Sequence, residues 1–140
     1  YLMVCSGDYV VESLSLTIRK MGYVALSEFN SFIQHADMVI NLRHPTMGET
    51  SGAVIRALGF GKPCIVSDEA WFSELPDDAV FKVPSEHISK ALYVALFRLL
   101  KRPELRKALS TRAKAHINHK HGLSKISREI INFLNLDARC

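Results

Sequence analysis

Short, largely apolar runs recur along this chain, and they are separated by longer segments in which apolar residues return every three or four positions. A short run of this kind is typical of a strand buried on both faces of a parallel sheet. The predicted strands are residues 1–6, 38–42, 64–67 and 80–83. Residues 22–26 leave room for a very short strand at most.

The segments between these runs have the spacing of amphipathic helices. In one of them, Gly61 is placed to take a left-handed conformation after the last helical turn, and Pro63 prevents the helix from continuing. Ser27 is a candidate cap at the start of another. The predicted helices are residues 8–21, 27–35, 51–60, 86–101, 104–119 and 124–136, with a turn at residues 75–78.

This alternation predicts an α/β fold, a doubly wound parallel sheet covered by helices on both faces in three layers, as in Rossmann-like domains. With 140 residues, about half of them apolar, the chain is expected to form one domain with an adequate core. Its first residue already lies in a predicted core strand, so we expect it to be a fragment of a longer protein.

Cysteine usage and hydropathy indicate the cellular compartment of the protein. Cys5, Cys64 and Cys140 lie far apart and match neither a disulfide framework nor a metal-ligand spacing, which favours a reducing cytoplasm. No apolar run approaches the roughly 20 residues that cross a bilayer, and no charged and apolar leader opens the chain. The sequence therefore predicts a cytoplasmic protein that is neither secreted nor membrane-spanning.

The formal net charge is +4, and much of the basic excess falls in residues 90–125, within predicted helices. We interpret it as a solvated helix face rather than a nucleic-acid or anionic-membrane surface, because no aromatic interleaving or groove-reading motif accompanies it. No nucleic-acid partner is expected. Peripheral attachment to a membrane stays open as an alternative.

Candidate chemistry is concentrated in residues 43–76, where a strand-ending loop leads into a helix and then a second strand. In α/β sheets, ligands bind beside the carboxyl ends of the strands. The first amides of a helix lack internal partners and lie at the positive end of its dipole, so an anion is favoured at Thr50, Ser51 and Gly52. Gly52 would let a diphosphate approach the backbone closely. The alternative is that Ser51 is an ordinary helix cap.

Glu49 stands beside this helix start. A carboxylate there can simply complement the helix dipole. It can also accept hydrogen bonds from vicinal hydroxyls next to a bound phosphate, and that combination suits a sugar phosphate. Arg43 borders the same crevice. It could contact a phosphate or sugar, or it could form a salt bridge that closes the loop, and the sequence leaves both roles open.

An ordered set of motifs carries a family resemblance. It consists of Arg43-x-Pro45-x-x-Gly48-Glu49-x-Ser51-Gly52, Arg56-Ala57-Leu58, Gly61-Lys62-Pro63, Val66-Ser67-Asp68 and Glu74-Leu75-Pro76. Over nearly its whole length the chain resembles the donor-binding C-terminal domain of retaining glycosyltransferases of family 4, also called group 1, which have the GT-B fold. The ordered set is fairly specific, although no single element is.

The resemblance implies roles for individual residues. Glu49 corresponds to the first glutamate of the family's E-x7-E motif, whose carboxylate binds hydroxyls of the donor sugar, and it is the candidate catalytic residue. The backbone around Gly48 and from Thr50 to Gly52 would meet the diphosphate. Arg56 takes the place of the second glutamate, which in the family holds the nucleotide ribose.

Three departures from the family pattern bear on the donor. A guanidinium cannot accept hydrogen bonds from ribose hydroxyls. Either another group binds the ribose, or Arg56 pairs with phosphate or with an acid such as Glu74. The usual glycine pair after the next strand is replaced by residues 68–72 (DEAWF), which predicts a bulkier pocket wall. The family's phosphate-binding Arg and Lys of an earlier strand–helix unit have no counterpart.

The implied reaction transfers a glycosyl group from a nucleoside-diphosphate sugar to an acceptor hydroxyl with retention. The acceptor, a sugar or a lipid-linked glycan, would bind an N-terminal domain that this sequence does not include, so the fragment alone is expected to be inactive. No cofactor or metal is expected, since there is no Asp-x-Asp motif and Asp77-Asp78 reads as a turn. The alternatives are a non-catalytic nucleotide- or partner-binding module and a sugar-nucleotide epimerase.

Structural interpretations are preferred for the remaining chemistry-bearing residues. His116, His119 and His121 read as a solvated helix end rather than a metal site. Trp71 and Phe72 are expected to pack rather than line a pocket, Cys64 to be a buried small side chain, and Asp68 to cap a turn.

Overall fold

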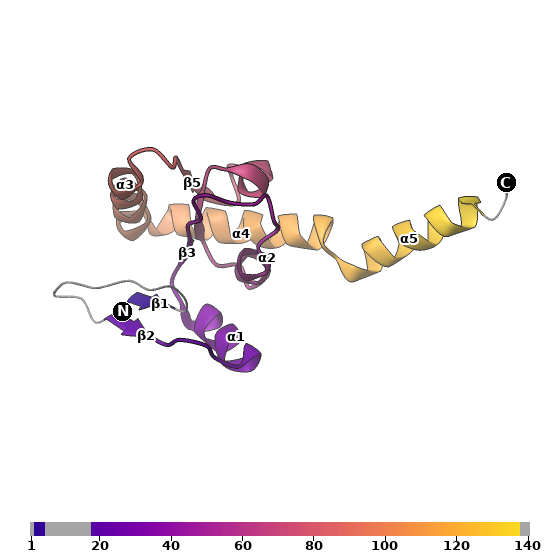
Figure 1. Cartoon of the computed structure of the whole chain (residues 1–140), viewed down its shortest axis with the longest axis horizontal. Helices are drawn as coiled ribbons and strands as arrows, with labels where there is room; N and C mark the ends of the chain where they lie inside the picture. Colours follow the sequence, from indigo (N-terminus) through magenta and orange to yellow (C-terminus); the bar gives the residue numbers. More distant parts are fainter. Residues whose placement is uncertain (1, 5–17, 138–140) are drawn as a thin grey trace. The chain divides into compact units, whose positions relative to one another are not determined.

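The computed structural model describes residues 2–4 and 18–137, which form two compact units, Tyr1–Phe32 and Ile33–Cys140 (Figure 1). In the first unit, β1 (Leu2–Val4) and β2 (Ile18–Lys20) are parallel neighbours, with Met3 opposite Arg19. Helix α1 (Leu26–His35) follows and leads into the second unit.

The first unit departs from the sequence prediction in three places, of which two precede α1. Most of the predicted helix over residues 8–21 lies outside the described residues, but its end is wrong, because residues 18–20 are strand β2. Their apolar spacing fits a helix, whereas pairing with β1 satisfies their backbone groups from across the chain. Residues 21–25 are irregular, so the very short strand considered for residues 22–26 is not formed.

The predicted cap at Ser27 is also wrong. The amide of Phe29 donates to the carbonyl of Ala25 at 2.9 Å, so the helical hydrogen-bond pattern begins before Ser27. Ser27 therefore lies inside the first turn of α1. The predicted helix itself is confirmed.

The second unit is built on a three-stranded parallel sheet in the order β3 (Val39–Asn41), β4 (Cys64–Ser67), β5 (Phe81–Val83). Ile65 lies opposite Ile40 on one side and Phe81 on the other. All four residues of the central strand β4 are buried, as expected for a strand covered on both faces.

After β3, the described part of this unit also contains the helices α2 (Gly52–Gly59), η1 (Ala70–Glu74, a short 3₁₀ helix), α3 (Ile88–Lys101), α4 (Pro103–Lys120) and α5 (Leu123–Asp137) (Figure 1). Helix α2 packs on β3, β4 and α4, while α3 packs on β5 and α4. One core joins Ile65 and Val83 to Ala95, Leu99 and Leu109 of α3 and α4. The neighbours Cys64 and Val66 point to the opposite face and are equally buried, so the α/β fold with a doubly covered parallel sheet is confirmed.

The end of α2 follows the predicted chemistry. Phe60 donates to Arg56 O, and Gly61 takes the left-handed conformation with φ +68°. The amide of Lys62 then reaches back to Ala57 O at 2.9 Å, and Pro63 leads into β4. These contacts end α2 and set its connection to β4.

In the part of the chain that the structure describes, each helix is too short or not apolar enough to span a lipid bilayer.

Candidate functional site

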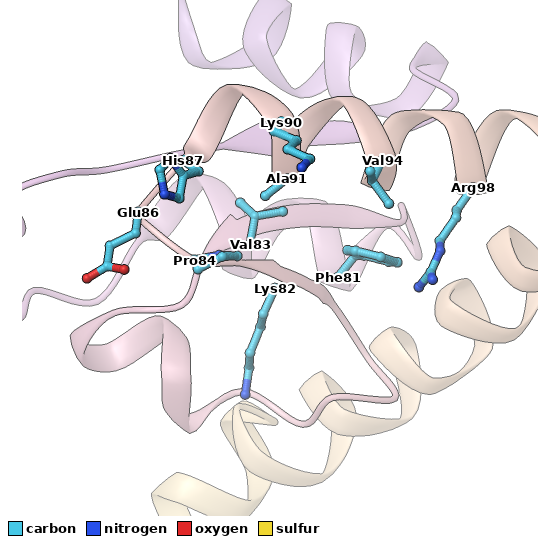
Figure 2. Close-up of a pocket in the computed structure, with 10 residues that line it drawn as sticks. All are labelled: Phe81, Lys82, Val83, Pro84, Glu86, His87, Lys90, Ala91, Val94 and Arg98. Atoms are coloured by element: carbon cyan, nitrogen blue, oxygen red, sulfur yellow. The ribbon is translucent and has the colours of Figure 1, made fainter.

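The predicted donor site is a loop, and it is distinct from a surface groove elsewhere in the second unit. A groove of about 460 Å³ lies between β5 and α3, lined among others by Phe81, Lys90 and Arg98 (Figure 2). None of the predicted site residues lines it. We therefore describe the site from the contacts of the β3–α2 loop, residues 42–51.

The β3–α2 loop begins at the carboxyl edge of the sheet, as predicted. The backbone amide of Arg43 donates to Ser67 Oγ at 2.8 Å, and Ser67 is the fully buried last residue of β4. This bond joins the ends of two neighbouring parallel strands. The position of Arg43 is therefore set by the sheet.

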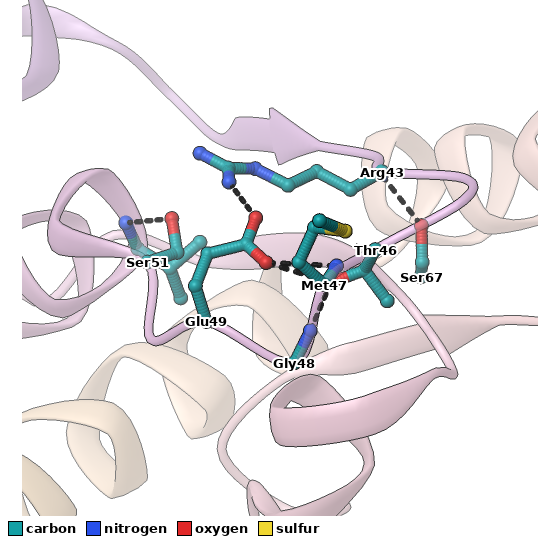
Figure 3. A network of polar contacts seen from close by, with 8 residues as sticks. Arg43, Thr46, Met47, Gly48, Glu49, Ser51 and Ser67 are labelled. Carbon is teal, nitrogen blue, oxygen red and sulfur yellow. Dashed lines mark hydrogen bonds and ion pairs between the residues drawn. The ribbon is translucent and has the colours of Figure 1, made fainter.

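Glu49 is the centre of a polar network in this loop (Figure 3). Its Oε1 forms an ion pair with the guanidinium of Arg43. Its Oε2 accepts hydrogen bonds from the Met47 amide at 2.9 Å and from the Thr46 hydroxyl at 3.3 Å, and Thr46 Oγ1 in turn accepts from the Gly48 amide at 3.2 Å. The sequence left two roles open for Arg43, a ligand contact or a salt bridge that closes the loop. In the structure, Arg43 forms the salt bridge.

The network keeps Glu49 ionised while leaving it accessible. The pKa of Glu49 is lowered from its ordinary value, first by its own backbone amide and next by Arg43. The Glu49 side chain is nevertheless 42% exposed and that of Arg43 41%. A small molecule can therefore reach a carboxylate that already carries its charge.

At the start of α2, Ser51 is a helix cap. Its Oγ accepts a hydrogen bond from the Val54 amide at 3.4 Å, and its carbonyl accepts the bond from Ile55 at 3.0 Å. The capping interpretation of Ser51 is thus confirmed, and it occupies the third amide of the helix. Thr50 and Gly52 are exposed, and a Cβ added to Gly52 would meet nothing within 4 Å. The outer side of the first turn is open.

Arg56 lies exposed on α2, one turn after Gly52. Among the described residues it forms no ion pair, so the pairing with Glu74 that the sequence left open is not formed. Its guanidinium is on the same helix as the candidate anion site.

A second polar contact, which the sequence analysis did not predict, joins the segments that follow β3 and β4. His44 Nδ1 lies 2.8 Å from Glu69 Oε1. The pKa of Glu69 is lowered, first by the Ser85 hydroxyl and also by His44. The available signal was the polar run of residues 67–69 at the carboxyl end of β4, since polar residues at that edge face the ligand side of the sheet.

The structure confirms two of these structural interpretations. Phe72 is completely buried, and Trp71 packs edge-on against it with ring centroids 5.3 Å apart, which confirms packing for Phe72. Cys64 is a buried thiol whose pKa is raised to about 12 by desolvation, as a structural cysteine requires.

The C-terminal histidines lie at the end of α4. The rings of His116 and His121 meet edge-on at 6.1 Å, and the pKa of His116 is lowered by partial burial and then by the charge of His121. Within the described ranges, no group of three or more His, Cys, Asp or Glu side chains is placed to hold a metal ion.

Comparison with known proteins bears on the family. No curated protein matches the chain. The model of a family described as glycosyl transferase-like matches residues 4–132, which is most of the chain. The resemblance found in the motifs is thereby confirmed at the level of a glycosyltransferase domain. The chain belongs to the glycosyl transferase-like family.

Proposed function

We propose that this chain is the donor-binding domain of a retaining glycosyltransferase of the group 1 type with the GT-B fold. Its donor, a nucleoside-diphosphate sugar, binds at the β3–α2 loop and the first turn of α2. One observation carries the proposal: an exposed, ionised Glu49 stands two residues before the Ser51 cap of α2, beside a first turn that is open at Gly52, at the carboxyl edge of a parallel sheet.

The diphosphate fits the first turn of α2. Backbone amides there carry partial positive charge, and Gly52 places no side chain in the approach. Arg43 and Arg56 lie on either side of this turn in sequence and supply full positive charges. Negative charge that grows on the leaving phosphate would be stabilised by these amides and cations, which is the main electrostatic need of the reaction.

Glu49 would bind hydroxyl groups of the donor sugar. Each carboxylate oxygen has two acceptor sites, and Oε2 already accepts from Met47 and Thr46 while Oε1 accepts from Arg43, so one site on Oε1 is left for a sugar hydroxyl and a second hydroxyl would have to replace the Thr46 bond. The carboxylate is charged at neutral pH and acts as an acceptor only, and its lowered pKa extends this to more acidic conditions. Its role is orientation of the sugar ring above the diphosphate.

In this proposal the glycosyl group passes to an acceptor hydroxyl with retention at the anomeric carbon and without a metal ion. The acceptor, a sugar or a lipid-linked glycan, is held by a different domain of the complete enzyme. The positive charges that metal-dependent enzymes obtain from a cation come here from Arg43, Arg56 and the helix amides.

Amide NMR titration of the 140-residue chain with UDP-glucose, GDP-mannose and the free nucleotides UDP and GDP tests the proposal. We expect saturable shifts at Gly52 and Ala53 with at least one sugar nucleotide. Gly52→Val should abolish them, because the added side chain enters space that the protein itself leaves open. Glu49→Gln should weaken binding of the sugar nucleotide and leave binding of the free nucleotide unchanged.

Glu129→Gln is the matched control, because it removes an exposed carboxylate on α5. Thermal unfolding of each variant verifies that the fold is retained. Absence of shifts at millimolar concentrations of all four ligands would refute donor binding at this loop.

A non-catalytic nucleotide-binding module is the second candidate, and the exposed Arg56 favours it. A basic side chain in place of a ribose-binding carboxylate suits recognition of phosphate rather than of ribose. In that case UDP or GDP would bind as tightly as the sugar nucleotides, Glu49→Gln would have no effect, and Arg56→Ala would abolish binding.

A further inference from the structure

The outer face of α3 presents a stripe of large apolar side chains to solvent. Tyr93, Phe97 and Leu100 are 69%, 53% and 62% exposed. They follow one another at intervals of four and three residues, so they lie along one side of the helix. The rings of Tyr93 and Phe97 stack with centroids 6.4 Å apart. Scattered apolar residues are common on surfaces, but an ordered aromatic stripe marks an interaction site.

This stripe is not required by the core. The inner face of α3 is formed by Ala95 and Leu99, which are fully buried, with Ala91, Leu92 and Leu96 packed beside them. These residues already provide the apolar face that a surface helix needs for docking on its sheet. The outer stripe is therefore additional.

Basic side chains border the stripe. At 100° per residue, Lys90 and Lys101 fall next to Phe97 on the helix surface, whereas Arg98 lies about 60° beyond Lys101, on the flank of α3 that faces β5. All three are exposed, Arg102 follows directly, and the sequence of α3 contains no acidic residue. The nearest acids along the chain are Glu86 before the helix and Glu104 in the first turn of α4.

The groove between β5 and α3 extends this basic side. Val94 and Arg98 project from α3 toward Phe81 of the sheet edge, and Lys90 lines the same groove (Figure 2). An open recess beside Arg98 gives a phosphate-bearing headgroup room to approach the guanidinium. The face thus combines an aromatic stripe with a cationic margin.

We infer that the outer face of α3 docks on an anionic lipid bilayer. Aromatic side chains are favoured at the membrane–water boundary, and exposed Lys and Arg are attracted to acidic headgroups. A helix with both on one side lies in the plane of the interface. A second copy of the chain fits less well, because it would bring Lys90, Arg98 and Lys101 of two helices together.

This conclusion differs from the interpretation of the basic segment by sequence alone. Lys101 and Lys90 lie four and seven residues from Phe97 along the chain, and the rotation of the helix brings both beside its ring. The docking surface is independent of the donor site, since it shares none of its residues.

Co-sedimentation of the 140-residue chain with sucrose-loaded vesicles tests the inference. Vesicles of phosphatidylglycerol and phosphatidylcholine should retain the chain, and vesicles of phosphatidylcholine alone should not. Lys90→Glu/Lys101→Glu should weaken binding about tenfold or more, since each basic residue near an anionic surface contributes a factor of about five. Tyr93→Ser/Phe97→Ser should abolish it.

Matched controls use exposed residues of α5. Phe133→Ser and Lys125→Glu remove an exposed aromatic and an exposed base elsewhere, and they should leave binding unchanged. The inference is overturned if these controls weaken binding as much as the α3 variants do, or if the wild-type chain does not co-sediment with anionic vesicles.

A second measurement separates a membrane from a partner copy. In a Trp71→Phe background, Phe97→Trp should give a blue-shifted emission on addition of anionic vesicles and none with neutral vesicles. Sedimentation velocity without lipid should give a monomer for both the wild-type chain and Tyr93→Ser/Phe97→Ser. A wild-type dimer that these substitutions dissociate would assign the face to self-association instead.

Discussion

The guanidinium of Arg43 and the carboxylate of Glu49 form an ion pair across the β3–α2 loop, while the backbone amide of Arg43 is anchored to Ser67. One residue therefore links the buried end of β4 to the exposed carboxylate proposed to bind the donor sugar. The loop is positioned by the sheet, and the side chain that would contact ligand is positioned by the loop.

The titration of Glu49 should reflect this network. The folded pKa lies below the ordinary value of 4.5, so the contribution of the network to stability is present above that value and is lost as pH falls through the lowered pKa. Carboxyl ¹³C NMR should place the midpoint below 4.5. Arg43→Ala should raise it only in part, because the backbone of Glu49 is the larger cause. Arg56→Ala should leave it unchanged, and a normal midpoint in the wild-type chain would contradict the network.

Removing the acceptor of the Arg43 amide should loosen the loop. Ser67→Ala keeps the buried volume nearly constant but leaves the amide without its partner. A partly buried amide left unsatisfied costs roughly 1–3 kcal/mol, and we expect the free energy of unfolding in urea to fall by about 1 kcal/mol. The Arg43 amide should also exchange faster with deuterium. Ser73→Ala, an exposed substitution in η1, should alter neither quantity.

The Cys64 thiol should not react with thiol reagents in the native protein. Its pKa of about 12 leaves almost no thiolate at pH 8, and its side chain is fully buried. In a Cys5→Ser/Cys140→Ser background, labelling by a thiol reagent should proceed only at the rate of unfolding and become fast in urea. Rapid labelling under native conditions would show that β4 is accessible.

The two glycines at the end of α2 should respond oppositely to alanine. Gly61 has φ +68°, a conformation that alanine adopts with strain, and its Cβ would meet the flexible side chain of Lys114. Gly61→Ala should destabilise the protein by about 1 kcal/mol. Gly59→Ala, in a helical conformation with its nearest neighbour 3.8 Å away, should be neutral or stabilising by up to about 1 kcal/mol. Thermal unfolding measures both, and equal effects would argue against the cap geometry.

The elements that sequence predicted well are those set by local chemistry. Residues 64–67 form β4 with the predicted bounds, and Gly61 and Pro63 end α2 as expected. The position of Glu49 directly before a helix start was also readable, because Ser51 is a capping residue followed by an apolar helical spacing. Each of these features depends on residues within one or two turns of one another.

One prediction was wrong because of a distant partner, and another because a helix begins earlier than its candidate cap. Residues 18–20 are a strand because β1 is available for pairing, and Ser27 lies within α1 because the helix begins earlier. The short helix η1 was not predicted, since no clear helical periodicity marks its five residues. Local spacing contains no information about which strand lies alongside.

The candidate site divides in the same way. The sequence by itself determined which residues are present at the strand end and the helix start, because capping and turn preferences act over a few residues. Only the tertiary structure decided that Arg43 reaches Ser67 across 24 positions, that His44 meets Glu69 across 25, and that Tyr93 and Phe97 remain exposed. Those contacts depend on strand order and on which helix face the sheet covers, and both are set by packing of the whole chain.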